Sequence, residues 1–246
     1  MAKQTLIDST VLVGGTGEAL DVSGSANSAL FDGSVEELDS SAFSDLARRR
    51  VGGLATATFA MTVMDEASTA EPWTTLSDLF AVNPAYFAWI ESNASMAEED
   101  FGVMLKALES SFSRGGEVGA MRQMQIGGSG DGQLIVAQVL QQDESLSSSG
   151  NSTGFQFGAL AAGETLWATQ FVLSATAGTL DGIIVSDSQA DFAASKETQI
   201  TFTQQSTVDA EQGSVAGAVT DDWWRYEYTI ATGPFTVVVL MGKALV

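Results

Sequence analysis

The chain has 246 residues, of which 31 are acidic and 10 basic, for a formal net charge of −21. It contains neither cysteine nor histidine, which excludes disulfides, thiolate nucleophiles, cysteine-based metal sites and the Ser-His-Asp triad. The acidity argues against a surface that binds DNA or RNA, because such affinity comes chiefly from Lys and Arg neutralising phosphates.

The rest of the composition favours a soluble, β-rich protein. Hydrophobic residues make up 45% and charged residues 17% of the chain. The uncharged polar residues are mostly Ser, Thr, Gln and Gly, and Thr, Val and aromatic residues fit a pleated surface. The N-terminus lacks the pattern of a signal peptide, and no apolar run reaches the roughly 18 residues of a membrane span. We therefore expect a protein that stays in a cytoplasm-like compartment and does not enter a membrane.

The first quarter of the chain predicts a strand, a loop and a long hairpin. Residues 5–13 have the composition of a strand that ends at Gly14-Gly15, and the Gly-, Ser- and Ala-rich stretch 14–33 favours a long loop or weak strand. Apolar residues then alternate with Thr and Ala over 55–63, which is the period of a strand with one buried face. SVEELDSSAF (34–43) is its expected partner, and SDLARRRVGG (44–53) is the connection at a long hairpin tip.

The next segment, residues 74–92, predicts one or two short helices. Apolar residues within 76–80 have helical spacing. NPAYFAWIES then places Asn83 as an N-cap and Pro84 at the first helical position. We expect the apolar face of these helices to pack against a sheet.

The middle of the chain has patterns that fit more than one type of secondary structure. Residues 101–119 fit a strand by their alternation and a helix by some of their spacings. The stretch 113–140 predicts two strands joined by the turn GGSGDG (127–132). That turn superficially resembles a phosphate-binding loop, but it lacks the Lys-Ser/Thr pair and the strand-then-helix context. We interpret it as a hairpin turn.

The C-terminal part predicts a second β domain. Residues 141–154 are polar and Ser-rich, which is typical of a linker. We expect a β domain over 1–142, a linker over 143–154 and a second β domain over 155–246. The last domain has five or six alternating strands in about 95 residues, which is typical of a β-sandwich or barrel. The predicted fold is therefore mainly β, a β-sandwich or barrel with one or two short helices plus a C-terminal β-sandwich-like domain.

The acidic residues offer little for chemistry. Runs of acids occur at 98–100, 143–144 and 221–222. A pair of carboxylates can cleave a glycoside, but adjacent acids in a strand point to opposite faces. No EF-hand-like spacing supports a Ca²⁺ site among the acids of 181–191. We expect solvated surface charge, no catalytic residue, no cofactor and no metal, and we rank a carboxylate-only hydrolase last.

The richest aromatic cluster is DDWWRYEYT (221–229). One alternating set is expected in the core of the sandwich (Trp224, Tyr226 and Tyr228). Trp223 points the other way and is a candidate for an interface. Exposed aromatic residues on a sheet bind sugars or stack bases, but base stacking needs cations and only Arg225 is near. The alternative function is thus an adhesion or glycan-binding module, in which Trp223 or Trp167 is exposed.

The basic residues gather at one place. Arg48, Arg49 and Arg50 are three of the ten cations in the chain. They are too few for a nucleic-acid patch on a chain of this charge. In a homo-oligomer, such a basic tip can pair with the acidic surface of the next copy and fix its register. We expect this triplet to make inter-subunit contacts.

Several stretches resemble the major tail (tail tube) proteins of long-tailed bacteriophages. They are MAKQTLIDSTVLVGG, SVEELDSSAFSDLARRRVGGLATATFAM and VMLKALESSFSRGGEVGAMRQMQI. The C-terminal stretch that begins AAGETLWATQFVLSATAGTLDGIIVSD is similar to a second half found in some of these proteins.

The resemblance implies a structural virion protein with no enzymatic activity. Copies would form rings, hexameric or trimeric with pseudo-sixfold symmetry, that stack into a hollow tube. Strands of neighbouring copies would close an inner β-barrel, and long loops or hairpins would lock one ring to the next. DNA would pass through a negative lumen without specific binding. The implied partners are further copies and the tape measure, tail terminator and distal tail proteins, in a tail assembled in the host cytoplasm.

Overall fold

The computed structural model describes most of the chain, namely residues 9–41, 50–65, 72–82, 84–92, 95–117 and 120–244. Within these ranges the protein is mainly β, as predicted, with sixteen strands and one short helix, α1 (Trp73–Leu79). Every strand pair is antiparallel.

Half of the strands precede residue 147 and half follow it. The first eight are β1 (Ser9–Gly15), β2 (Glu18–Asp21), β3 (Ala26–Asp39), β4 (Arg50–Met64), β5 (Ala85–Glu91), β6 (Phe101–Gly115), β7 (Gln123–Gly130) and β8 (Ile135–Leu146). The others are β9 (Gly150–Asn151), β10 (Phe155–Gln156), β11 (Thr165–Ala175), β12 (Leu180–Asp187), β13 (Glu197–Thr201), β14 (Asp209–Ala216), β15 (Trp223–Ile230) and β16 (Phe235–Ala244).

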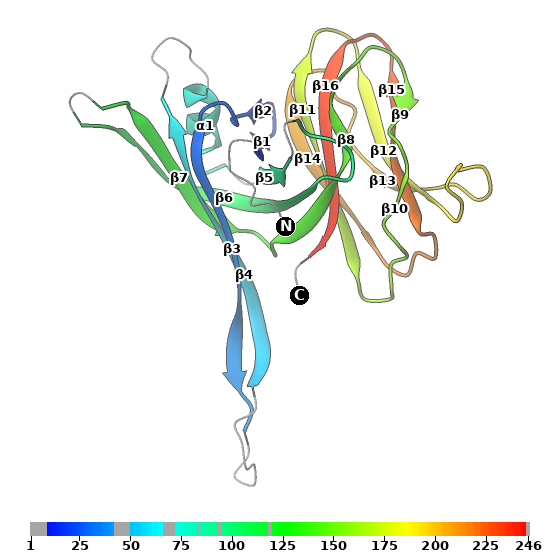
Figure 1. Ribbon diagram of the computed structural model, residues 1–246, viewed down its shortest axis with the longest axis horizontal. Helices are drawn as coiled ribbons and strands as arrows, with labels where there is room; N and C mark the ends of the chain where they lie inside the picture. Colours follow the sequence, from blue (N-terminus) through cyan, green and yellow to red (C-terminus); the bar gives the residue numbers. More distant parts are fainter. Residues whose placement is uncertain are drawn as a thin grey trace.

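An eleven-stranded sheet runs through both parts of the chain, in the order β14-β11-β16-β8-β6-β5-β1-β2 (Figure 1). Strand β6 branches it, because its start pairs with β8 and its end, Ala107–Gly115, pairs with β7. Strand β7 in turn pairs with β4, and β4 with β3. Of the segment expected as a linker, 143–146 continue β8, and β9 pairs with β15.

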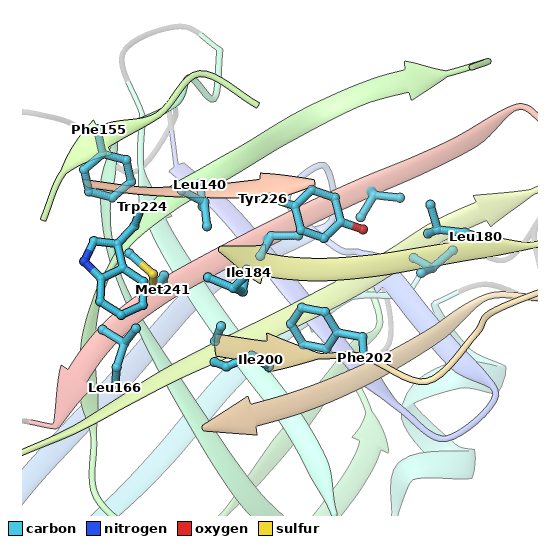
Figure 2. Close-up of a cluster of buried hydrophobic side chains, with 14 of the residues drawn as sticks. Leu140, Phe155, Leu166, Leu180, Ile184, Ile200, Phe202, Trp224, Tyr226 and Met241 are labelled. Atoms are coloured by element: carbon cyan, nitrogen blue, oxygen red, sulfur yellow. The ribbon is translucent and has the colours of Figure 1, made fainter. Parts of the chain in front are cut away.

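A second sheet covers one end of the first and forms the sandwich. Its order is β10-β15-β12-β13, with β9 also beside β15. Figure 2 shows Trp224 and Tyr226 of this sheet lying in a cluster with Leu140 and Met241 of the large sheet. Both aromatic side chains are fully buried, as the alternation predicts. Their polar atoms are satisfied, since Trp224 Nε1 donates to the Gly158 carbonyl (3.1 Å) and Tyr226 Oη donates to Gln170 Oε1 (2.8 Å).

Two further clusters occupy the faces of the N-terminal strands. On the face of the large sheet that the second sheet also covers, α1 packs Leu76 and Leu79 into a cluster. Within this cluster Phe59 and Phe87 stack at 3.9 Å between ring centroids. The opposite face carries the third cluster, which extends from β1 to β14. The sheet curls around it until its two edges approach, and Gly17 N donates to Asp209 Oδ1 at 2.6 Å. Strands β2 and β14 do not pair, so the barrel stays open.

The structure corrects the helix expected at Asn83 and Pro84. Asn83 lies outside the described residues, and Pro84 leads directly into strand β5. This strand is central and nearly all of its side chains are buried, since clusters lie on both of its faces. A strand buried on both faces has no alternation, and a short apolar run does not distinguish it from a helix.

Two other local predictions have different outcomes. The stretch 14–33, for which a long loop or a weak strand was expected, contains β2 and the start of β3, so the strand alternative holds there. GGSGDG is not a hairpin turn, because β7 and β8 do not pair but lie end to end along β6. Its first glycines belong to β7, where a Cβ at Gly128 would collide with the carbonyl oxygen of Leu108. Glycine is therefore required there by the close approach of two strands.

Candidate assembly surface

The most exposed part of the fold is the two-stranded ribbon of β3 and β4, which we call the arm. Figure 1 shows it projecting from the body. Pairing is regular from Ala26 opposite Val63 to Asp39 opposite Arg50, with two bulges. Strand β7 supports β4 over Thr58–Met64 alone. Beyond that point neither strand has a third neighbour among the described residues. Unpaired edges of this kind are templates for pairing with another chain.

The sequence explains why the arm has a buried base and an exposed end. Near the body, alternate residues of β4 point into the cluster beneath α1 (Ala57, Phe59, Met61 and Val63). Farther out small and polar residues become frequent, and a pair of hydroxyls, Ser34 and Thr56, meets across the strands at 2.9 Å. No residue of β3 is buried. Because an isolated two-stranded ribbon is marginally stable at best, the end of the arm gains little stability from its own packing.

The arm nevertheless carries large apolar side chains that are exposed to solvent. Five are exposed, namely Leu30, Val35, Leu38, Val51 and Leu54. Leu54 is 78% exposed and Leu30 63%. Leu38 and Val51 are direct cross-strand partners and so share one face of the ribbon. Contiguous exposed apolar groups mark interaction sites.

Of the predicted basic triplet, Arg50 lies at the end of this arm. Arg48 and Arg49 are outside the described residues, so nothing here places their side chains. Arg50 begins β4 and forms an ion pair with Glu37 of its own chain. Both side chains are more than half exposed, and such a pair contributes little to stability. The inter-subunit role of the triplet stays a prediction.

A hollow of about 660 Å³ lies at the base of the arm, over the sheet of β3, β4, β7 and β6. Its open face is formed by small or uncharged residues, which are Ser28, Leu30, Ala60, Thr62, Ser111, Ser113, Gln125 and Gly127. A strongly acidic chain thus presents an uncharged, concave surface here.

The candidate interface residue Trp223 lies at the start of β15. It is partly buried, and its cross-strand partners are Gln156 and Asp187. The same face of the sheet carries Arg225, whose guanidinium lies 4.1 Å from the ring centroid of Phe192. Phe192 belongs to the β12–β13 connection and is buried. That connection therefore covers part of the outer face, and an interface at Trp223 stays a prediction.

Glu109 and Asp65 are two of the four buried acids among the described residues, and their burial was not expected from the sequence. Glu109 of β6 is fully buried, and within the described ranges neither of its carboxylate oxygens has a hydrogen-bond partner. Burial raises the pKa of this carboxyl to about 8. The signal is present in the sequence, because Glu109 continues the alternating set of Leu105 and Ala107 that faces the core.

Asp65, by contrast, is paired. It accepts hydrogen bonds from Arg114 Nε and Nη2, at 2.6 and 3.1 Å, and Arg122 Nε lies 3.3 Å away. The hydrogen bond from Arg114 lowers the pKa of this carboxyl. Arg114 also lies over Trp73 of α1, 4.1 Å from the ring centroid. The end of β4, which is the base of the arm, is thereby tied to β6 and to the helix.

The described residues hold no group of three or more Asp or Glu placed to bind a metal ion. The acidic run at 221–222 is engaged locally, since Asp221 accepts a hydrogen bond from buried Ser186 at 2.8 Å. Over the same ranges, no helix is long and apolar enough to cross a membrane.

Comparison with known proteins finds similarity in structure alone. No family model and no curated protein matches the chain. Among solved structures, the SPP1 tail tube aligns with 12% identity over 55% of this chain and 78% of that chain, at a TM-score of 0.45. The sheath/tube terminator of the PVC extracellular contractile injection system aligns with 12% identity over 55% and 97%, also at 0.45.

Other similar structures differ in kind. The SPP1 Dit hub protein aligns over 96% of this chain and 99% of that chain, with 10% identity and a TM-score of 0.34. Carbohydrate-binding modules also appear, for example a cellulose-binding domain from Cellulomonas fimi with 10% identity over 46% and 80%, at 0.29. The structural neighbours thus include tail tube proteins, the class that the sequence resembles. All these identities are 10 to 12% and all these TM-scores are below 0.5, so we argue function from the residues of this chain.

Proposed function

We propose that the protein is a structural subunit of a phage-type tail, whose copies form rings that stack into a hollow tube for DNA. The arm is the observation that carries this proposal. It combines unpaired strand edges with exposed apolar side chains, and both features are stabilised when another protein covers them. A second copy of the chain has the same unpaired strand edges and exposed apolar side chains to cover, so it is the partner we favour.

The contact between copies is heterologous in this proposal, because the arm and the surface that receives it are different parts of the chain. Such contacts generate closed rings or continuous helical stacks. The uncharged hollow at the base of the arm is the receiving surface we favour, since it does not repel an apolar, acidic ribbon. Arg48, Arg49 and Arg50 would then meet acidic groups of the neighbour, and Trp223 would contribute a second contact.

The ring we favour is a hexamer, with a trimer of pseudo-sixfold symmetry as the alternative. Residues 1–142 would form the tube wall and 155–246 a second β domain. The tape measure, terminator and distal tail proteins would be the other partners, in a tail assembled in the host cytoplasm. A net charge of −21 suits a channel for DNA, because like charges keep the passing genome from sticking. The role requires no catalytic residue.

Negative-stain electron microscopy of the purified protein, alone and with tail extract, tests the proposal. We expect stacked rings or tubes with a central channel. Leu54→Asp should abolish them, because it places a charge in the contact, while the monomer stays folded. Met121→Asp is the matched control, since Met121 is also exposed but lies outside the arm. A chain that stays monomeric under all these conditions would overturn the proposal, as would tubes that form equally well with Leu54→Asp.

A further inference from the structure

A polar cleft surrounds Trp167 of β11. Two hollows of about 700 and 200 Å³ share Trp167 and Gln133 among their lining residues, so they adjoin. Their combined size is in the range of small-molecule sites. We call this the Trp167 cleft, defined by Lys106, Asp131, Gln133, Trp167, Gln212 and Lys243.

The indole of Trp167 is open toward the cleft. Its direct cross-strand partners are Ser214 on β14 and Gly242 on β16. A serine and a glycine place no large side chain directly beside the ring, which is partly buried. Gly242 cannot carry a side chain, because a Cβ there would collide with the carbonyl oxygen of Val136. One side of the indole packs on the third cluster, and the rest presents apolar surface to the cleft.

Polar groups around the indole are held in place by their own partners. Lys106 Nζ lies 3.1 Å from Asp131 Oδ2, and Gln212 Nε2 donates to buried Thr169 Oγ1 at 3.0 Å. Among the described residues, the side-chain amide of Gln133 has no intramolecular hydrogen bond and is exposed. The cleft therefore combines an apolar platform with oriented donors and acceptors.

The cleft is electrically balanced, although the chain as a whole carries −21. Lys106 is paired with Asp131, and Lys243 Nζ lies 2.9 Å from Glu164 Oε2. Paired charges give no net attraction for an anion or a cation, but they remain strong hydrogen-bonding groups. The chemistry thus suits a neutral ligand with many hydroxyls and one apolar face.

We propose that the Trp167 cleft binds a neutral saccharide. The C–H face of a sugar ring packs on the indole, and its hydroxyls bond to the Lys-Asp and Lys-Glu pairs and to the two amides. The site lies at the joint of the two halves of the chain, not on the Trp223 face of the sandwich. It does not depend on the tail role, because it involves none of the residues of the arm.

The test is a panel of neutral and charged mono- and oligosaccharides, applied to the full chain and followed by calorimetry and by tryptophan emission. We expect binding of at least one neutral saccharide. Trp167→Ala should weaken it at least tenfold and Gln133→Ala several-fold. Trp167→Phe should retain most of the affinity, because a ring remains. Trp223→Ala is the matched control and should leave binding unchanged.

If Trp167→Ala fails to fold, Gln133→Ala at an exposed position and Lys106→Met at a half-buried position still test the proposal. The proposal is overturned if no neutral saccharide binds, if charged saccharides alone bind, or if Trp223→Ala removes the binding. It is also overturned if Trp167→Ala disrupts self-association instead, which sedimentation would show and which would make the cleft a subunit interface. Microscopy of rings reports separately on the tail role.

Discussion

The C-terminal sandwich and the arm are built from the same kind of strand, yet they differ in where their stability comes from. In the sandwich, Trp224 and Tyr226 are fully buried and their polar atoms have partners within the chain. In the arm, β3 has no buried residue and Leu54 is largely in water. The sandwich is thus complete as a single chain, whereas the arm presents surface that a further molecule can bury.

This contrast shows what strand alternation does and does not report. Alternation predicts two faces for β4 and for β15 alike, and both strands have them. It does not say whether the apolar face is covered by the same chain. Burial of apolar area supplies the free energy, so two similar patterns have different stabilities. Mutations that separate stability from assembly therefore test the difference.

The largest expected effect is at the centre of the sandwich. Trp224→Ala should lower the free energy of unfolding by about 4 kcal/mol, because it removes a fully buried indole and leaves a cavity. Urea unfolding followed by circular dichroism measures this. The neighbouring Trp223→Ala, at a partly buried position, should cost much less. Equal losses at both positions would contradict the view that only one face of β15 is core.

A smaller effect, opposite in sign, is expected at Glu109 beneath the base of the arm. Its folded-state pKa of about 8 exceeds the ordinary value of 4.5. Between these values the native state holds more protons than the unfolded chain, so stability falls as pH rises, by up to about 1.4 kcal/mol per pH unit. Glu109→Gln removes this dependence and should raise stability by about 3 kcal/mol at pH 7.

Urea titrations at pH 4.5 and pH 8 measure the Glu109 effect. The variant and the parent should be nearly equal at the lower pH and should diverge at the higher one. Glu36→Gln, an exposed position on the arm, is the control and should show no divergence. If the gap between Glu109→Gln and the parent is independent of pH, Glu109 is ionised in the native state and the reasoning fails.

The sequence predicts a large part of this fold, but some strands can be predicted from it and others cannot. Strand β4 and the burial of Trp224 and Tyr226 follow from alternation, because β4 and β15 each have one covered and one open face. Strand β5 does not follow, because it is buried on both faces and has no period. The branching of β6 does not follow either, since pairing between distant segments leaves no local pattern.

The candidate sites divide in the same way. Clustering of Arg48, Arg49 and Arg50 is visible in the sequence, but the ion pair that Arg50 makes with Glu37 depends on the register of the hairpin. The Trp167 cleft is assembled from β6, β11, β14, β16 and the connections beside them. No spacing along the chain brings these residues together. In the sequence Trp167 is therefore one aromatic residue among several, and only the fold shows the residues that form the cleft around it.

The smallest effect on stability is expected on the arm, where the effect on assembly should be large. Leu38→Ser removes an exposed side chain that contacts little of its own chain, so the free energy of unfolding should change by less than about 0.5 kcal/mol. Sedimentation should nevertheless show fewer assembled particles. Leu76→Ser, at a fully buried position of helix α1, is the reverse control, since it should destabilise the monomer. If Leu38→Ser destabilises the monomer to a similar degree, the end of the arm is packed by its own chain, and the contrast with the sandwich disappears.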